Sequence, residues 1–322
     1  MFGKKLVVDM IGRSSQNQTD RRRFLRAAGA AGMGAVGAGV VGTSVMGAMS
    51  ASADSADIAD VADGVGTAAA PSDGAVLNFA LNLEYLEAEF YSYAVHGHGL
   101  ADKLTSGLQT RGGVVGGKKV PFKTRRIAQY AAEIAGDELA HVKFLRSALG
   151  RSAVSRPQID IKNSFTAAAR AAGLISSTQT FDPFANEDNF LLGAFLFEDV
   201  GVTAYKGAAP LIDNKAYLEA AAGILAVEAY HAATIRTSLY EKGLYQAAGK
   251  ISMARDALDG GKDGDQGIRW KGMANIVPAA PTGIAYSRSP GKVLNVVYLN
   301  TKSVKKGGFF PNGVHGAVNT SA

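Results

Sequence analysis

The stretch VEAYHAA (residues 227–233) places a glutamate and a histidine three positions apart within an alanine-rich segment, 214–242, whose pattern predicts a helix. Positions i and i+3 lie on one face of an α-helix, so Glu228 and His231 point the same way. Apolar residues share that face at spacings of 3 and 4, which is typical of a helix packed into a core. Both polar groups are therefore expected to be buried, and a buried carboxylate needs a compensating positive charge.

The same arrangement recurs in three other predicted helices. Residues 124–149 contain a second Glu-x-x-His motif within an apolar stripe, formed by Glu138 and His141. Segments 73–95 and 186–207 each carry one glutamate in such a stripe, followed seven residues later by a tyrosine on the same face. These pairs are Glu84 with Tyr91 and Glu198 with Tyr205. The order along the chain is therefore Glu, Glu-x-x-His, Glu, Glu-x-x-His.

Two glutamates and two Glu-x-x-His motifs facing the inside of a four-helix bundle form a ligand set for two iron or two manganese ions. The predicted metal ligands are Glu84, Glu138, His141, Glu198, Glu228 and His231. Four carboxylates nearly neutralise two divalent ions, so burial becomes favourable once metal is bound. We expect Glu138 and Glu228 to bridge the ions, each histidine to cap one ion, and the remaining glutamates to be terminal ligands.

Other polar residues near these positions receive different predictions. We expect Tyr91 and Tyr205 to orient ligand carboxylates through hydrogen bonds. Glu87, one turn from Glu84, is a candidate for an extra ligand, although the third helix has glycine at the matching position. Asp137 and Asp199 point about 100 degrees away from the neighbouring glutamates, so we expect them in solvent or in interhelical ion pairs. The alternative to a metal site is a set of buried Glu–His hydrogen bonds.

The bulk composition narrows the function further. The 322-residue chain contains no cysteine, which excludes disulfides, thiolate metal sites and cysteine nucleophiles. Its formal net charge is +6, but residues 1–53 hold seven basic and two acidic residues, so the remainder carries only +1. A nearly neutral globular part has no overall field that attracts phosphate backbones, and we expect no nucleic-acid partner.

The basic segment itself predicts export. Arg21 and Arg22 precede Phe24-Leu25 and a glycine- and alanine-rich run, which ends at Ala51-Ser52-Ala53 before Asp54. This pattern resembles a twin-arginine signal peptide, with the twin-arginine export machinery as a partner. It implies a bacterial protein in the periplasm or outside the cell, tethered to the membrane if the signal is not cleaved. The alternative is a chance basic stretch before a membrane helix.

The predicted fold class is all-α, a four-helix bundle with a glycine-rich insertion in its first helical hairpin and a long irregular C-terminal tail. The expected parts are a signal peptide at 1–53, a flexible leader at 54–72, the bundle at 73–245 and an extension packed on it at 246–322. A short helix is expected around 164–172. VLNVVYL (293–299) is the stretch that reads as a β-strand.

Several of these motifs resemble a known family. LNFALNLEYLEAEFY, FEDVGVTAY, EAYHAATIR, RSPGKVLNVVY and GGFFPNGVHG are similar to segments of exported ferritin-like proteins related to plant desiccation-related proteins. The likeness covers about residues 73–322 and implies a ferritin-like fold. In ferritin-like enzymes, the matching positions bind metal and react with oxygen or peroxide.

The resemblance leaves the function open among three classes. The first is a di-metal oxidoreductase, ferroxidase-like or catalase-like, that acts on oxygen or peroxide in stress protection. The second is a non-catalytic stress protein stabilised by its metal site. The third, iron storage, is disfavoured because the insertion and the long tail would obstruct the packing of a storage cage. Neither the choice between iron and manganese nor the oligomeric state follows from the sequence.

Overall fold

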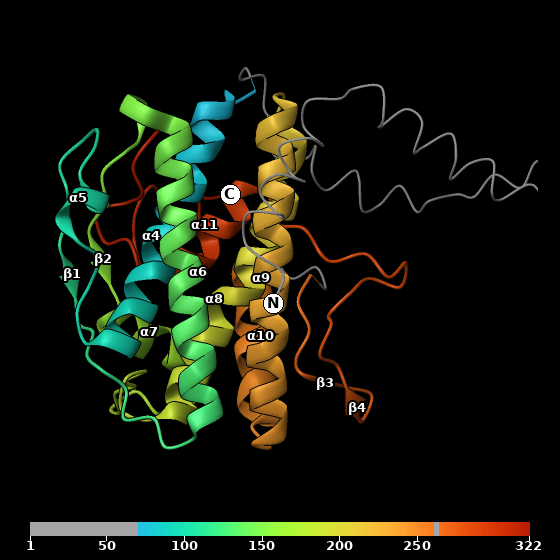
Figure 1. The fold of residues 1–322 in the computed structure, drawn as a ribbon. Helices are drawn as coiled ribbons and strands as arrows, with labels where there is room; N and C mark the ends of the chain where they lie inside the picture. Colours follow the sequence, from blue (N-terminus) through green and yellow to red (C-terminus); the bar gives the residue numbers. More distant parts are fainter. Residues whose placement is uncertain (1–69, 261–263) are drawn as a thin grey trace, which may run out of the picture. The chain divides into compact units, whose positions relative to one another are not determined.

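The computed structural model describes residues 70–260 and 264–322, in which four long helices form a bundle (Figure 1). These helices are α4 (Asp73–His96), α6 (Arg125–Leu149), α8 (Glu187–Ala208) and α9 (Lys215–Glu241). Each begins and ends within one residue of a predicted segment. The predicted all-α bundle is thus confirmed, whereas the predicted export signal lies outside the described residues.

Local capping residues explain where the helices begin and end. The side chains of Ser72, Asn186 and Asn214 accept hydrogen bonds from backbone N–H groups in the first turns of α4, α8 and α9. Such caps satisfy N–H groups that have no partner within the helix. Just after α9, Gly243 has a φ of 71°, a conformation that favours glycine and ends the helix.

The connections give the bundle its topology. α6 ends beside the start of α4, where Asn78 Nδ2 donates to the carbonyl oxygen of Ser152 at 3.0 Å. α8 begins beside the start of α6, where the backbone N–H of Thr124 donates to Glu187 Oε2 at 2.9 Å. The chain between α6 and α8 therefore crosses the full length of the bundle. This crossover contains the 3-10 helix η1 (Gly150–Ser152), β2 (Ile159–Asp160) and α7 (Asn163–Ala171).

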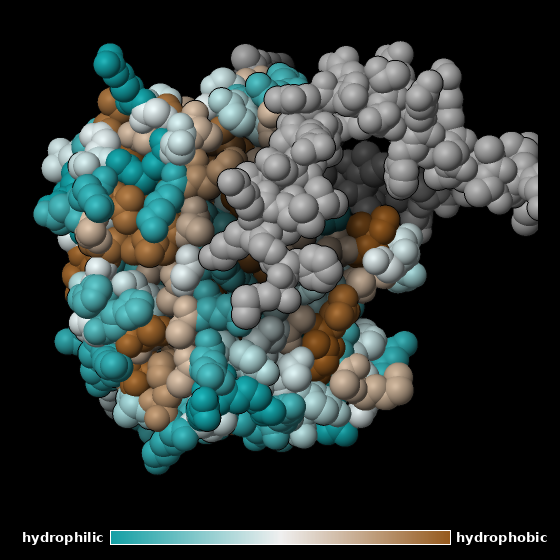
Figure 2. Space-filling model, in the orientation of Figure 1, coloured by the Kyte–Doolittle hydropathy of each residue, from teal (hydrophilic) through white to brown (hydrophobic). Residues whose placement is uncertain are grey.

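The four helices differ in how much of their surface is covered. All residues from 81 to 92 in α4 and from 190 to 200 in α8 are buried, so neither helix has a solvent-exposed face over these stretches. α6 and α9 are amphipathic and keep exposed outer faces. Figure 2 shows teal hydrophilic residues, mixed with tan and brown ones, on the side where α6 lies. Helices α7, α10 and α11 and the C-terminal tail supply the cover that α4 and α8 need.

The C-terminal extension differs from the prediction at two places. It contains an unpredicted helix, α10 (Tyr245–Asp259), and the stretch predicted as a strand forms α11 (Pro290–Tyr298) instead. The strand prediction was wrong because a short apolar run that is buried all round shows neither helical nor strand periodicity. Ser289 caps this helix and Pro290 occupies its first turn, which are local signals of a helix start.

A buried ionic network holds the extension against the bundle. Its members are Asp199 of α8, Arg236 of α9, Arg255 and Asp259 of α10, and Asp265 and Arg288 of the following segment. Asp199 Oδ2 lies 2.7 Å from both Arg236 and Arg255. Removing one member of such a network leaves buried charges uncompensated, so the extension is an integral part of the folded unit.

The remaining elements are short and peripheral. They are α5 (Asp102–Thr105), β1 (Val114–Val115), the 3-10 helix η2 (Ala209–Leu211), β3 (Arg269–Trp270) and β4 (Met273–Ala274). β1 pairs in parallel with β2, and β3 pairs antiparallel with β4. Brown hydrophobic surface is visible near β3 in Figure 2. The exposed large hydrophobic residues of the described chain include Met273 and Val277. In the described part of the chain, no helix has the length and apolarity needed to span a membrane.

Candidate metal centre

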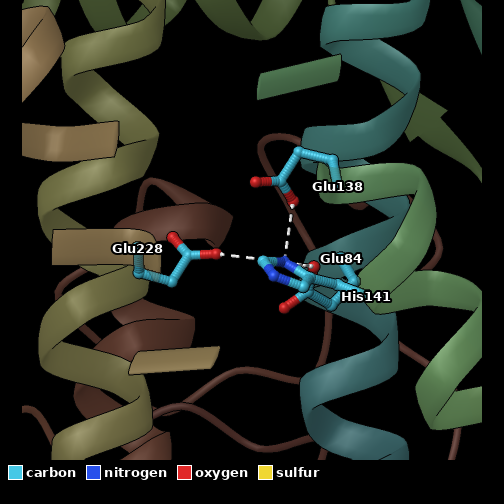
Figure 3. A group of neighbouring side chains, drawn as sticks. All are labelled: Glu84, Glu138, His141 and Glu228. Atoms are coloured by element: carbon cyan, nitrogen blue, oxygen red, sulfur yellow. Dashed lines mark ion pairs between the residues drawn. The ribbon is translucent and has the colours of Figure 1, made fainter. Parts of the chain in front are cut away.

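The six predicted ligands meet halfway along the bundle, in its interior. Their donor atoms form two overlapping groups, and within each group all donor atoms lie within 4.8 Å of one another. One group consists of Glu84, Glu138, His141 and Glu228, which Figure 3 shows converging from three helices. The other consists of Glu138, Glu198, Glu228 and His231. Glu138 and Glu228 belong to both groups, which is the arrangement expected of two bridging carboxylates.

The distances show that the shared carboxylate of Glu138 lies between the two histidines. Its Oε2 lies 3.7 Å from Nδ1 of His141, and its Oε1 lies 3.2 Å from Nδ1 of His231. The terminal glutamates follow the same division: Glu84 Oε2 is 3.2 Å from His141 Nδ1, and Glu198 Oε2 is 3.5 Å from His231 Nδ1. Each histidine thus belongs to one half of the site.

The donor atoms are buried and lack hydrogen-bond partners, which makes the cluster costly without a cation. The buried atoms without a partner include Oε2 of Glu84 and Glu198, both carboxylate oxygens of Glu138 and Glu228, and Nδ1 of both histidines. Buried polar atoms in native proteins are normally paired, and each unpaired one costs free energy. Carboxylate oxygens and imidazole nitrogens are suitable ligands for iron and manganese. The residues present therefore fit a pair of such ions.

The electrostatics of the six side chains support the same interpretation. Burial, together with the charge of Glu138, raises the pKa of Glu84 to about 7, and burial raises the pKa of Glu228 well above its ordinary value. Burial alone would lower the pKa of His141, but the neighbouring Glu84 and Glu138 raise it to about 11. Without metal, protons on the carboxylates and histidines balance the charge. Metal ligation requires neutral imidazole and ionised carboxylate, so binding of metal here would release protons.

Two tyrosines hold the terminal glutamates, and each does so across the helix pair. Tyr91 of α4 donates a hydrogen bond to Oε1 of Glu198 on α8, and Tyr205 of α8 donates to Oε1 of Glu84 on α4. Burial, and then the adjacent glutamate, raise the pKa of both phenols well above the ordinary value, which keeps them protonated as donors. Each hydrogen bond uses Oε1 of its glutamate and leaves Oε2 directed at the other candidate metal-ligand atoms.

Glu87 lies near the cluster but in neither group of donor atoms. It is buried. A Cβ atom added at Gly201 would lie 3.5 Å from Glu87 Oε1 and 2.4 Å from Glu228 Oε2. The shared carboxylate of Glu228 therefore occupies the space that a side chain at position 201 would fill. The role of Glu87 as an extra ligand stays a prediction, and Gly201 has a steric role that the sequence did not indicate.

Two aspartates beside the ligands form interhelical contacts, one of the two environments expected for them. Asp137 Oδ2 on α6 lies 3.1 Å from Nε2 of His231 on α9. Asp199 is bound to Arg236 and Arg255 in the buried network. The sequence did not indicate that Asp137 contacts a ligand histidine. The only signal was its position directly before Glu138 in a Glu-x-x-His motif.

Comparison with known proteins identifies the family. The chain belongs to the ferritin-like domain family, whose model matches residues 72–241. It is similar to the desiccation-related protein PCC13-62 of Craterostigma plantagineum, with 31% identity over 250 residues that cover 69% of this chain and 76% of the relative. It is also similar to the ferritin-like catalase Nec2 of Nesocodon mauritianus, with 29% identity over 269 residues that cover 77% and 85%.

No solved structure matches the chain with comparable significance. The family match and the desiccation-related relative confirm the resemblance that the helix motifs indicated. A buried cluster that could hold metal lies within the matched region, since all six residues fall between positions 72 and 241.

Proposed function

We propose that this protein binds two Fe or two Mn ions with Glu84, Glu138, His141, Glu198, Glu228 and His231, and that it carries out redox chemistry on peroxide or oxygen. The main support is the buried set of donor atoms without hydrogen-bond partners, arranged in two groups that share Glu138 and Glu228. A zinc site would be expected to use a smaller tetrahedral set. The similarity to a protein named as a ferritin-like catalase favours peroxide as the substrate class.

The chain's own residues would prepare the site in three ways. Four carboxylates balance the charge of two divalent ions, which makes burial of the cluster favourable. The two tyrosines hold the terminal glutamates in place through hydrogen bonds that cross between α4 and α8. The surrounding apolar helices limit the access of water to the cluster. When bound, a pair of Fe or Mn ions would supply the two electrons that reduction of peroxide consumes and would accept the two that its oxidation releases.

A second candidate is a stress protein in which the metal stabilises the fold without turnover. The similarity to a desiccation-related protein favours it. The position of the cluster also favours it, because ligands from all four helices would tie the bundle together when metal is bound. The two candidates share the metal site and differ in whether peroxide is consumed.

The test combines metal analysis with a substitution that leaves the shape of the site intact. Glu228→Gln keeps the size of the side chain but removes a shared carboxylate. The matched control is Glu219→Gln, on the same helix and exposed to solvent. We expect the parent and the control to bind about two metal ions per chain and to consume peroxide. Glu228→Gln should neither bind the two ions nor consume peroxide.

The outcomes separate the candidates. Two metal ions without peroxide consumption would refute the catalytic proposal and favour the structural one. Absence of bound Fe or Mn from the parent protein after growth with both metals would refute both. Burial raises the pKa of Glu228, which favours the neutral form of its carboxyl group in the metal-free protein. Glutamine is also neutral and has the same size, so the metal-free Glu228→Gln protein should unfold at a temperature no lower than the metal-free parent.

We also propose that the protein is exported by the twin-arginine route, on the basis of Arg21 and Arg22 and the run that follows. Replacing both residues by lysine should retain the protein in the cytoplasmic fraction of a bacterial host. An unchanged exported fraction would contradict this proposal.

A further inference from the structure

The two helical hairpins of the bundle carry the same residues at matching positions. The matching pairs are Glu84 and Glu198, Tyr91 and Tyr205, Glu138 and Glu228, and His141 and His231. In this approximate internal repeat, each half of the metal centre has one terminal glutamate, one histidine and a share of the two common glutamates. From the ligands alone, the two halves would be expected to bind metal equally well.

The repeat is broken beside the Glu-x-x-His motifs. Asp137 precedes Glu138 on α6, whereas Val227 precedes Glu228 on α9. Asp137 Oδ2 lies 3.1 Å from Nε2 of His231, the ring nitrogen opposite to the one that faces the donor group. Val227 offers no such acceptor to His141. In residues 70–260 and 264–322, no hydrogen-bond acceptor pairs with Nε2 of His141.

The contact from Asp137 has a defined effect on the ligand that it touches. A carboxylate that accepts a hydrogen bond from the outer N–H of a ligand histidine fixes the tautomer and orientation of the ring and makes the inner nitrogen a stronger donor. Loss of such a partner typically lowers metal affinity by about 10- to 100-fold. Asp137 is about half exposed, with a side-chain exposure of 46%, so it can be substituted without opening the core.

We propose that the two metal positions are inequivalent and that Asp137 is the positioning residue that makes them so. The position held by Glu198 and His231 fills first, and the position held by Glu84 and His141 fills second and exchanges its ion more readily. This inference rests on the proposed function only in requiring two ions at the site. It does not depend on turnover.

Calorimetric titration of the metal-free full chain with Mn²⁺ tests the proposal. We expect two binding steps per chain, separated by about 10- to 100-fold in affinity. Asp137→Asn preserves the size of the side chain but replaces the charged acceptor by a neutral amide, so it should weaken the first step and bring its affinity closer to that of the second while two ions still bind. Glu133→Gln, an exposed glutamate on the same helix, is the matched control and should leave both steps unchanged.

Two further variants assign the steps to the two halves of the site. His141→Ala should keep the tight step and lose the weak one, and His231→Ala should do the reverse. Val227→Asp places a carboxylate at the matching position of α9 and should strengthen the second step. If Asp137 contributed only to folding, a carboxylate introduced by Val227→Asp would not strengthen metal binding.

The results distinguish this inference from the proposed function. Absence of Mn²⁺ and Fe²⁺ binding by the parent would overturn the proposed function. Two ions bound with equal affinity, or two unequal steps that Asp137→Asn leaves unchanged, would overturn the inference alone. Loss of the tight step in His141→Ala rather than in His231→Ala would also overturn it, since the order of filling would then be reversed.

Discussion

The close approach of Gly201 to Glu228 leads to a prediction in which metal binding and folding stability change in opposite directions. A Cβ at position 201 would lie 2.4 Å from Oε2 of Glu228 and 3.2 Å from its Cδ. Ordinary contact between non-bonded heavy atoms requires about 3.5 Å, so the carboxylate of Glu228 would have to retreat by roughly 1 Å in Gly201→Ala. The nearest other atom is Oε1 of Glu87, at 3.5 Å, so only the flexible ends of side chains stand in the way.

The metal-free protein should become more stable in this variant. Alanine in a helix interior is favoured over glycine by about 0.5–1 kcal/mol. Without metal, the Glu228 side chain can move aside. When metal is bound, the Glu228 side chain cannot move aside, because metal–ligand distances vary by only about 0.2 Å and Glu228 is shared by both halves of the site. We expect a loss of at least about 100-fold in metal affinity, equivalent to about 2.7 kcal/mol.

The assay is thermal unfolding of the same preparations with and without Mn²⁺, together with metal analysis after dialysis. The matched control is Gly223→Ala in α9, where an added Cβ meets no atom within 4 Å. The control should stabilise both forms equally and retain its metal. Gly201→Ala should raise the unfolding temperature of the metal-free form and lose most of the increase that Mn²⁺ produces in the parent.

Two results would refute this reasoning. Unchanged metal content in Gly201→Ala would show that Glu228 can accommodate the new methyl group while remaining a ligand, or is not a ligand. A large loss of stability in the metal-free variant would show that position 201 is needed for helix packing, not for the space occupied by Glu228.

The remaining predictions concern stability. Arg255→Met should destabilise the protein by about 3 kcal/mol in denaturant unfolding, since it leaves two buried aspartates with one arginine each. An unchanged midpoint would show that the network contributes little. Burial alone would raise the pKa of Glu187, but hydrogen bonds from Lys242 and Thr124 lower it from 4.5 to about 2. Its contribution to stability is therefore present above pH 4.5 and is lost as the pH falls towards 2, and Glu187→Gln should flatten the pH dependence of unfolding in that range.

The four bundle helices and the candidate ligands were predictable because each depends on information within one or two helical turns. Residues such as Ser72 and Asn214 determine where a helix begins. The spacing of Glu228 and His231 determines that both lie on the buried face. Apolar periodicity identifies that face without knowledge of any neighbour.

The sequence by itself therefore determined which residues point into the bundle, and the tertiary structure alone decided what they meet there. Tyr91 shares a helix face with Glu84, yet its hydroxyl contacts Glu198 on the neighbouring helix. Contacts of this kind depend on how far one helix is displaced along another, which local periodicity does not specify. The same holds for Asp137 beside His231 and for the space that Gly201 leaves to the carboxylate of Glu228. The helix at 290–298 has local start signals in Ser289 and Pro290, but residues 293–298 are buried on all sides and therefore lack the periodic pattern from which a helix is predicted.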